Sequence, residues 1–131
     1  MILTAADLKP TQEANPSYQL PTLTGWAYHS GDDLAWASPD FDDRHWPKLP
    51  PPTDDPWHIP DDVAWTGIGW FRLHLRLDAP LLNRDLAMLI YHSGAVEVFL
   101  NGTRVFSQGI VGQRMEDEVP DVVLYDEVVK I

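Results

Sequence analysis

The stretch that decides the fold, residues 67–109, reads GIGWFRLHLRLDAPLLNRDLAMLIYHSGAVEVFLNGTRVFSQG. From position 70 to 77, apolar residues alternate with basic ones: Phe71, Leu73, Leu75 and Leu77 against Arg72, His74 and Arg76. Successive side chains of a β-strand point to opposite faces, so this alternation predicts a strand over 70–77. We expect its Phe/Leu face to enter a core and its Arg/His face to meet water or a ligand.

Two other features of the stretch also predict strands. Residues 86–91 are apolar at every position, which is typical of a strand covered on both faces. Asn101-Gly102 then separates 95–100 from 103–107, and this dipeptide favours a type I′ turn because both central residues need a positive φ. We therefore expect an antiparallel hairpin here, with additional strands at 25–29 and 121–125.

The order of these features resembles one known domain family. A strand with an aromatic residue and an arginine is followed by an all-apolar strand, the small-residue corner Ser93-Gly94-Ala95, the hairpin VEVFLNG and then Ser107-Gln108-Gly109. This order is similar to the galactose-binding-like jelly-roll domain found at the front of family 2 glycoside hydrolases and in the extracytoplasmic part of some bacterial membrane sensors. The likeness covers residues 26–123 and is densest over 67–109.

Two flanking segments extend the resemblance. Residues 31–46 resemble an acidic loop of the family, with aromatic residues at intervals of five: Trp36, Phe41 and Trp46. Residues 109–120 resemble the Gly-x-x-Gly…Glu-x-Pro connection of the sensor version of the domain. This second likeness favours a sensor over a hydrolase as the host protein.

The resemblance implies an all-β fold, a jelly-roll β-sandwich. Residues 1–24 contain three prolines among polar residues and predict an N-terminal arm or an edge strand. Residues 25–131 then form the sandwich domain, with a Pro-rich loop at 47–60. The family has a further strand after this point, so either the chain lacks that last strand or 121–131 fills its place.

Composition excludes several classes of partner and chemistry. The 131 residues include 20 acidic and 9 basic side chains, for a net charge of −11, which disfavours nucleic acid and anionic membranes as partners. The chain has no cysteine, so disulfides and thiolate metal sites are excluded. No apolar run reaches the ~20 residues of a membrane helix, and the first residues do not resemble a signal peptide. An extracytoplasmic location would therefore make the chain an excised piece of a membrane protein.

Catalytic motifs are not found in the sequence. Adjacent acidic pairs such as Asp32-Asp33 diverge in loops, whereas glycosidase carboxylates converge from separate elements. The five histidines lack zinc-site spacing, and no serine lies in a Gly-x-Ser-x-Gly elbow. In the glycoside hydrolases that the chain resembles, the catalytic carboxylates lie in a separate barrel domain. We therefore predict no catalytic activity and no cofactor.

Calcium is the one metal that the acidic loops suggest, because hard cations bind carboxylate oxygens. The EF-hand pattern is missing, however, and aspartates that cap turns are the commoner explanation. We therefore predict no metal site.

A ligand site is predicted at the loop end of the sandwich. Sugar sites combine aromatic rings with polar side chains, and the six tryptophans supply the rings. The alternative site is the outward strand face with Arg72, His74, Arg76 and Glu97, but Arg72 and Glu97 are expected to pair across neighbouring strands. We assign Trp57 and Trp65 as stacking platforms and His58 and His92 as hydrogen-bonding groups. Packing is the expected role of Trp36, Trp46 and Trp70.

The favoured function is a non-catalytic recognition module that binds carbohydrate or another small molecule. As the resemblance implies, it would serve as the extracytoplasmic, periplasmic or cell-surface, sensory part of a larger bacterial signalling protein and contact the remainder of that parent protein. One alternative is an accessory sugar-binding domain of a family 2 type glycoside hydrolase. The other is a structural or dimerisation domain that forms a homodimer.

Overall fold

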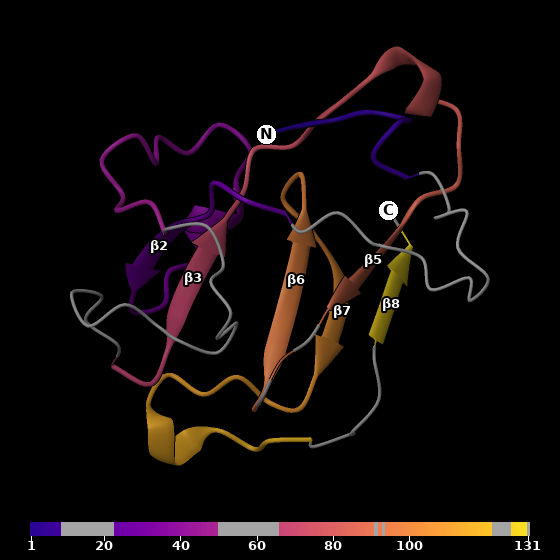
Figure 1. Ribbon diagram of the computed structural model, residues 1–131. Helices are drawn as coiled ribbons and strands as arrows, with labels where there is room; N and C mark the ends of the chain where they lie inside the picture. The colour runs from indigo at the N-terminus through magenta and orange to yellow at the C-terminus, as the bar shows by residue number, and fades with distance from the viewer. Residues whose placement is uncertain (9–22, 50–65, 91, 93, 122–126, 131) are drawn as a thin grey trace.

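The computed structural model describes residues 1–8, 23–49, 66–90, 92, 94–121 and 127–130 (Figure 1). Within these residues the chain forms eight short strands arranged as four two-stranded sheets. The helical segments described are single 3₁₀ turns: η1 (Leu34–Ala37), η2 (Ala79–Leu81) and η3 (Met115–Asp117). The protein is therefore a β protein, as the alternating sequence predicts. No helix in the described part is long and apolar enough to cross a membrane.

The strands β2 (Ala27–Ser30) and β3 (Gly69–Arg72) pair antiparallel, although 38 residues separate them in sequence. Their register places Tyr28 opposite Phe71 and His29 opposite Trp70. Ala27 and Tyr28 are buried, with 0% and 3% of their surface exposed, so β2 lies in the core. After the loop the chain lies beside β2 again, where Lys48 forms an isolated antiparallel β-bridge with Ala27.

The strand predicted over 70–77 is interrupted in the structure. Regular pairing with β2 ends at Arg72, and β4 (Arg76–Leu77) pairs in parallel with β1 (Ile2–Leu3). The backbone between Arg72 and Arg76 therefore changes partner from one sheet to another. Alternation of side chains does not reveal such a change, because both pieces are extended.

The expected orientation of this strand is also wrong at its start. Phe71 is 44% exposed, whereas only 11% of the Arg72 side chain is exposed. The reason is that the face of β3 carrying Trp70 and Arg72 is covered by residues of the 31–46 loop. Phe71 lies on the other face, where its ring centre is 5.1 Å from that of Tyr28.

The remaining strands form two antiparallel pairs, and in sequence order one pair is enclosed by the other. The inner pair, β6 (Val96–Leu100) and β7 (Thr103–Gln108), is the predicted Asn-Gly hairpin. The φ angles of Asn101 and Gly102 are 49° and 84°, both positive as a type I′ turn requires. The outer pair joins β5 (Ala87–Ile90) to β8 (Glu127–Lys130).

Three expectations fall partly outside the described residues. Of the strand predicted at 121–125, only Asp121 is described, and it is not in a strand; β8 begins later, at Glu127. Of the predicted arm at 1–24, β1 lies beside β4, whereas residues 9–22 lie outside the described part. Residues 50–60 of the Pro-rich loop predicted at 47–60 also lie outside it, as do residues 61–65.

The best-buried described residues come from β1, β2, the 31–46 loop, η2 and β7. The buried apolar residues are Leu3, Ala27, Tyr28, Trp46 and Leu81. Two polar residues are as deeply buried, Asp43 at 5% exposure and Gln108 at 8%. Both have hydrogen-bonding partners, as buried polar groups require.

Candidate functional site

The loop from Gly31 to Trp46 covers one face of β2 and β3, and aspartates shape its turns. Asp33 caps η1 by accepting a hydrogen bond at 2.9 Å from the Ala35 backbone N–H. Asp42 accepts one from the Arg44 backbone N–H at 3.2 Å and also pairs with the Arg44 guanidinium. Turn capping, which the sequence favoured over calcium binding, thus occupies both residues. In the described part, no three His, Cys, Asp or Glu side chains are grouped so that they could hold a metal ion.

Six rings from this loop, from β2 and β3, and from the hairpin form an aromatic cluster. Its members are His29, Trp36, Phe41, Trp46, Trp70 and Phe99. Trp46 lies at the centre, with ring centroids 5.0 Å from His29, 5.2 Å from Trp36 and 5.6 Å from Phe41. Trp70 stacks on Phe99 at 5.2 Å, which connects β3 to β6. Such contacts stabilise a fold by about 0.5 to 1.5 kcal/mol per pair beyond burial.

Trp36, Trp46 and Trp70, for which packing is predicted, differ in how deeply they are buried. Trp46 is 8% exposed and packs in the core. Trp36 and Trp70 are only half-buried, so each contributes to packing and also leaves part of its indole at the surface.

Arg72 of β3 binds the 31–46 loop through several hydrogen bonds. Its Nε donates to Asp43 Oδ2 at 3.1 Å, and its Nη2 donates to the Ser38 carbonyl at 3.2 Å. Its Nη1 donates to the Trp36 carbonyl, and the guanidinium lies 5.5 Å from the centre of the Phe41 ring. The planar five-donor guanidinium suits this role because it can reach several acceptors at once.

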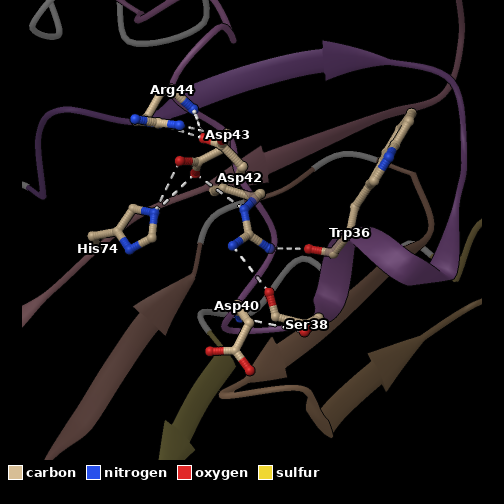
Figure 2. A network of polar contacts seen from close by, with 8 residues as sticks. Trp36, Ser38, Asp40, Asp42, Asp43, Arg44 and His74 are labelled. Carbon is tan, nitrogen blue, oxygen red and sulfur yellow. Dashed lines mark hydrogen bonds and ion pairs between the residues drawn. The ribbon is translucent and has the colours of Figure 1, made fainter.

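Asp43, Arg72 and His74 form a hydrogen-bonded triad that we call the anchor. Figure 2 shows His74 facing the Asp43 carboxylate, with Nε2 at 2.9 Å and 3.1 Å from its two oxygens. Burial raises the pKa of Asp43, but the hydrogen bonds and positive charges of Arg72 and His74 outweigh it and lower the pKa below its ordinary value. The carboxylate is therefore held ionised inside the fold.

The expected pairing of Arg72 with Glu97 does not occur. Glu97 instead accepts a hydrogen bond at 2.6 Å from Arg104 within the β6–β7 hairpin. Arg72 instead pairs with the buried Asp43 carboxylate, at 3.1 Å from Nε to Oδ2. The strand face considered as an alternative ligand site is therefore partly buried within the protein, at Arg72.

A second group of residues, which we call the rim, lies at the edge of the aromatic cluster. It consists of His29, Asp32, Trp36 and Trp70. Trp70 Nε1 donates to Asp32 Oδ1 at 2.7 Å, and the Trp36 and Trp70 rings meet edge to face at 6.2 Å. His29 and Asp32 are exposed, and the two indoles are half-buried. The rim thus combines aromatic surface with outward-facing polar atoms.

The corner that follows β5 contains His92, the one predicted ligand-binding residue that the structure describes. Its Nδ1 lies 3.1 Å from the Gly94 carbonyl oxygen and its Nε2 lies 2.9 Å from Gln108 Oε1. Gln108 in turn donates from Nε2 to the Asp121 carbonyl at 3.1 Å. Both ring nitrogens of His92 therefore lie within hydrogen-bonding distance of acceptors in the protein. Its predicted companions Trp57, His58 and Trp65 lie outside the described residues.

Comparison with protein-family models, curated proteins and solved structures finds no match. The geometry of the anchor, the rim and the corner therefore carries the functional argument.

The sequence analysis missed the roles of His29, Asp32 and Asp43. The alternation over 70–77 does place Trp70, Arg72 and His74 on one face of a strand. Basic residues that become buried when a loop packs against a strand need carboxylate partners. The sequence could therefore have indicated that an aspartate of the loop pairs with Arg72. It does not single out Asp43 among the aspartates of the loop, because that choice depends on the path of the loop over β3.

Proposed function

We propose that the chain is a non-catalytic recognition module that binds carbohydrate and has the jelly-roll form of a β-sandwich. In this proposal it is the extracytoplasmic sensory part of a larger bacterial signalling protein, the host favoured by the resemblance over 109–120. The observation that carries the binding function is the rim, where two partly exposed indoles lie beside polar atoms that have no other partner among the described residues.

The strand pairing supports the jelly roll. In this fold a long hairpin is bent over so that pairs of strands nest inside one another and distribute between two sheets. In sequence order the β6–β7 pair is likewise enclosed by the β5–β8 pair. The connection of β3 to β6 through Trp70 and Phe99 is consistent with packing between layers.

The chemistry of the rim supports carbohydrate binding. The C–H bonds on one face of a pyranose carry partial positive charge and can pack on the negative face of an indole. Sugar hydroxyls around that face need hydrogen-bonding partners, which His29 and Asp32 can supply. The loop-end residues Trp57, His58, Trp65 and His92 remain part of the proposal as an alternative contact.

The use of the described ionisable groups supports a non-catalytic role. A general acid or base must reach its substrate, and its pKa should lie near the working pH. Asp43 is 5% exposed, is bound by Arg72 and His74 and has a lowered pKa, so its environment suits structural support. His92 is committed to Gly94 and Gln108.

One observation favours the competing function, a dimerisation domain. Ile110 and Val119 face each other across an isolated bridge and are 60% and 53% exposed. Paired apolar side chains at the surface are typical of protein contacts when they belong to a larger patch.

The test is titration of a glycan panel followed by tryptophan fluorescence, with the wild type and with Trp57→Ala, Trp65→Ala and Trp36→Phe variants. We expect at least one glycan to bind and at least one of these substitutions to weaken binding while the fold is retained. The same protein should release no product from chromogenic glycosides. A panel without any binder would contradict the proposed function, and hydrolysis abolished by a single carboxylate substitution would show an enzyme. Sedimentation of a stable dimer without glycan binding would favour the competing function.

A further inference from the structure

We infer that the rim selects carbohydrates that carry a protonated amine, such as β-1,4-linked glucosamine oligomers, over neutral sugars of the same shape. This inference rests on the proposed function and names its class of ligand. It follows from the hydrogen-bonding polarity of the rim, whose open polar atoms accept hydrogen bonds and do not donate them.

His29 offers the ligand an acceptor. Its Nδ1 lies 2.7 Å from the Ser30 carbonyl oxygen, which can only accept, so the ring hydrogen of the neutral imidazole is on Nδ1. Nε2 then carries a lone pair. The ring is exposed, and Nε2 makes no hydrogen bond to any of the described residues.

Asp32 offers a second acceptor, and this one is charged. Its Oδ1 accepts the Trp70 indole hydrogen at 2.7 Å, which holds the carboxylate beside the ring. Its Oδ2 makes no hydrogen bond to the described part of the chain. An ionised carboxylate cannot donate, so both open polar atoms of the rim require a donor from the ligand.

The aromatic rings reinforce this preference. The faces of Trp36 and Trp70 are negative because of the ring quadrupole, and an ammonium group within about 6 Å of an indole is attracted to it. A sugar hydroxyl donates one hydrogen, whereas a protonated amine donates three and carries charge, so its hydrogen bond to a carboxylate is stronger.

The charge of the whole chain acts in the same direction. A net charge of −11 raises the local concentration of cations near the surface and repels anionic sugars such as uronic acids. Asp32 converts this general attraction into a local one because its carboxylate is fixed at the edge of the stacking surface.

The experiment compares three tetrasaccharides with one backbone: cellotetraose, the β-1,4-linked glucosamine tetramer and its N-acetylated counterpart. They differ only at position 2 of each sugar, as hydroxyl, ammonium or acetamide. Calorimetric titration at a pH where the amines are protonated should show the glucosamine tetramer binding about tenfold or more tightly than either neutral tetramer. Raising the salt concentration should weaken only the charged ligand.

Asp32→Asn is the decisive variant, because Asn Oδ1 can still accept the Trp70 hydrogen while the charge is lost. We expect this variant to lose most of the preference, so that its affinity for the glucosamine tetramer falls about tenfold relative to its affinities for the two neutral tetramers. Asp42→Asn is the matched control, since it removes one charge from the same loop at a residue paired with Arg44. It should bind all three ligands like the wild type.

Two sets of results would overturn the inference. One is equal or weaker binding of the glucosamine tetramer by the wild type, which is decided without any variant. The other is full retention of the amine preference in a folded Asp32→Asn protein. In either case, binding of any neutral glycan in the panel leaves the proposed function standing, whereas failure of every glycan to bind refutes both.

Discussion

At the scale of single residues, the anchor explains how a strongly acidic chain uses one of its carboxylates inside the fold. Asp43 is 5% exposed, and its partner Arg72 has 11% of its side chain exposed. Removing one member of a buried pair leaves the other with an uncompensated charge, which costs more than the pair itself contributes. The loop over β3 therefore depends on both residues together.

The first prediction is that Asp43→Asn lowers the free energy of unfolding at neutral pH by about 2 to 3 kcal/mol. Asparagine keeps the shape and one acceptor but leaves Arg72 without its counter-charge. Urea unfolding followed by tryptophan fluorescence measures the change. Asp42→Asn, at an exposed pair, should leave the urea midpoint unchanged. Equal midpoints for all three proteins would contradict the role of the anchor.

The same variant has a defined pH dependence. The folded pKa of Asp43 lies below its unfolded value because Arg72 and His74 outweigh the effect of burial. The native state therefore binds fewer protons, so the stabilisation is complete above pH about 4 and is lost as the pH falls through the folded pKa. The difference in unfolding free energy between wild type and Asp43→Asn should shrink in acid. A difference that stays constant down to pH about 2 would show that the carboxylate charge is not responsible.

At the scale of elements, the β6–β7 hairpin is followed by a close approach of backbones. Gly109 has a φ of +70°, and a Cβ at this position would lie 2.5 Å from the Val119 carbonyl oxygen and 3.0 Å from the Asp121 nitrogen. Ile110 and Val119 exchange backbone hydrogen bonds of 2.9 Å and 3.0 Å next to it. Glycine is therefore required here both for its backbone angle and for its lack of a side chain.

The second prediction compares Gly109→Ala with Gly25→Ala. Gly25 has a similar φ of +85°, but a Cβ there would meet no atom within 4 Å. Gly25→Ala should cost about 1 kcal/mol from backbone strain alone. Gly109→Ala should cost at least about 2 kcal/mol more, because backbone atoms must move apart. Thermal unfolding of both variants gives the comparison, and equal losses would mean that the close approach does not exist in solution.

At the scale of the whole molecule, the surplus of negative charge opposes the compact state. The chain carries 20 acidic and 9 basic side chains, and folding brings these charges closer together. Salt shortens the Debye length from about 30 Å at 0.01 M to about 8 Å at 0.15 M, so it screens this repulsion.

The third prediction is that the melting temperature rises by about 3 °C between these two salt concentrations. Differential scanning calorimetry measures it. Asp40→Lys changes the net charge from −11 to −9, because one negative charge is replaced by one positive charge, and should reduce the salt effect. A melting temperature that falls with salt would instead show that exposed ion pairs dominate.

The amino-acid sequence by itself determined the β class and the position of the hairpin. Alternation over 95–107 and the Asn101-Gly102 turn are local properties, since a strand and a tight turn are specified by neighbouring residues. Four predicted strands accordingly have counterparts in β2, β5, β6 and β7.

Only the tertiary structure decided which face of β3 is covered and which residues meet there. Alternation distinguishes two faces but does not say which one a distant loop will cover, so Phe71 and Arg72 were assigned to the wrong sides. The pairing of Asp43 with Arg72 spans 29 residues, and the hydrogen bond from Trp70 to Asp32 spans 38. Such partners are chosen by the path of the chain in space, because burial of a charge selects the counter-charge within reach and not one close in sequence.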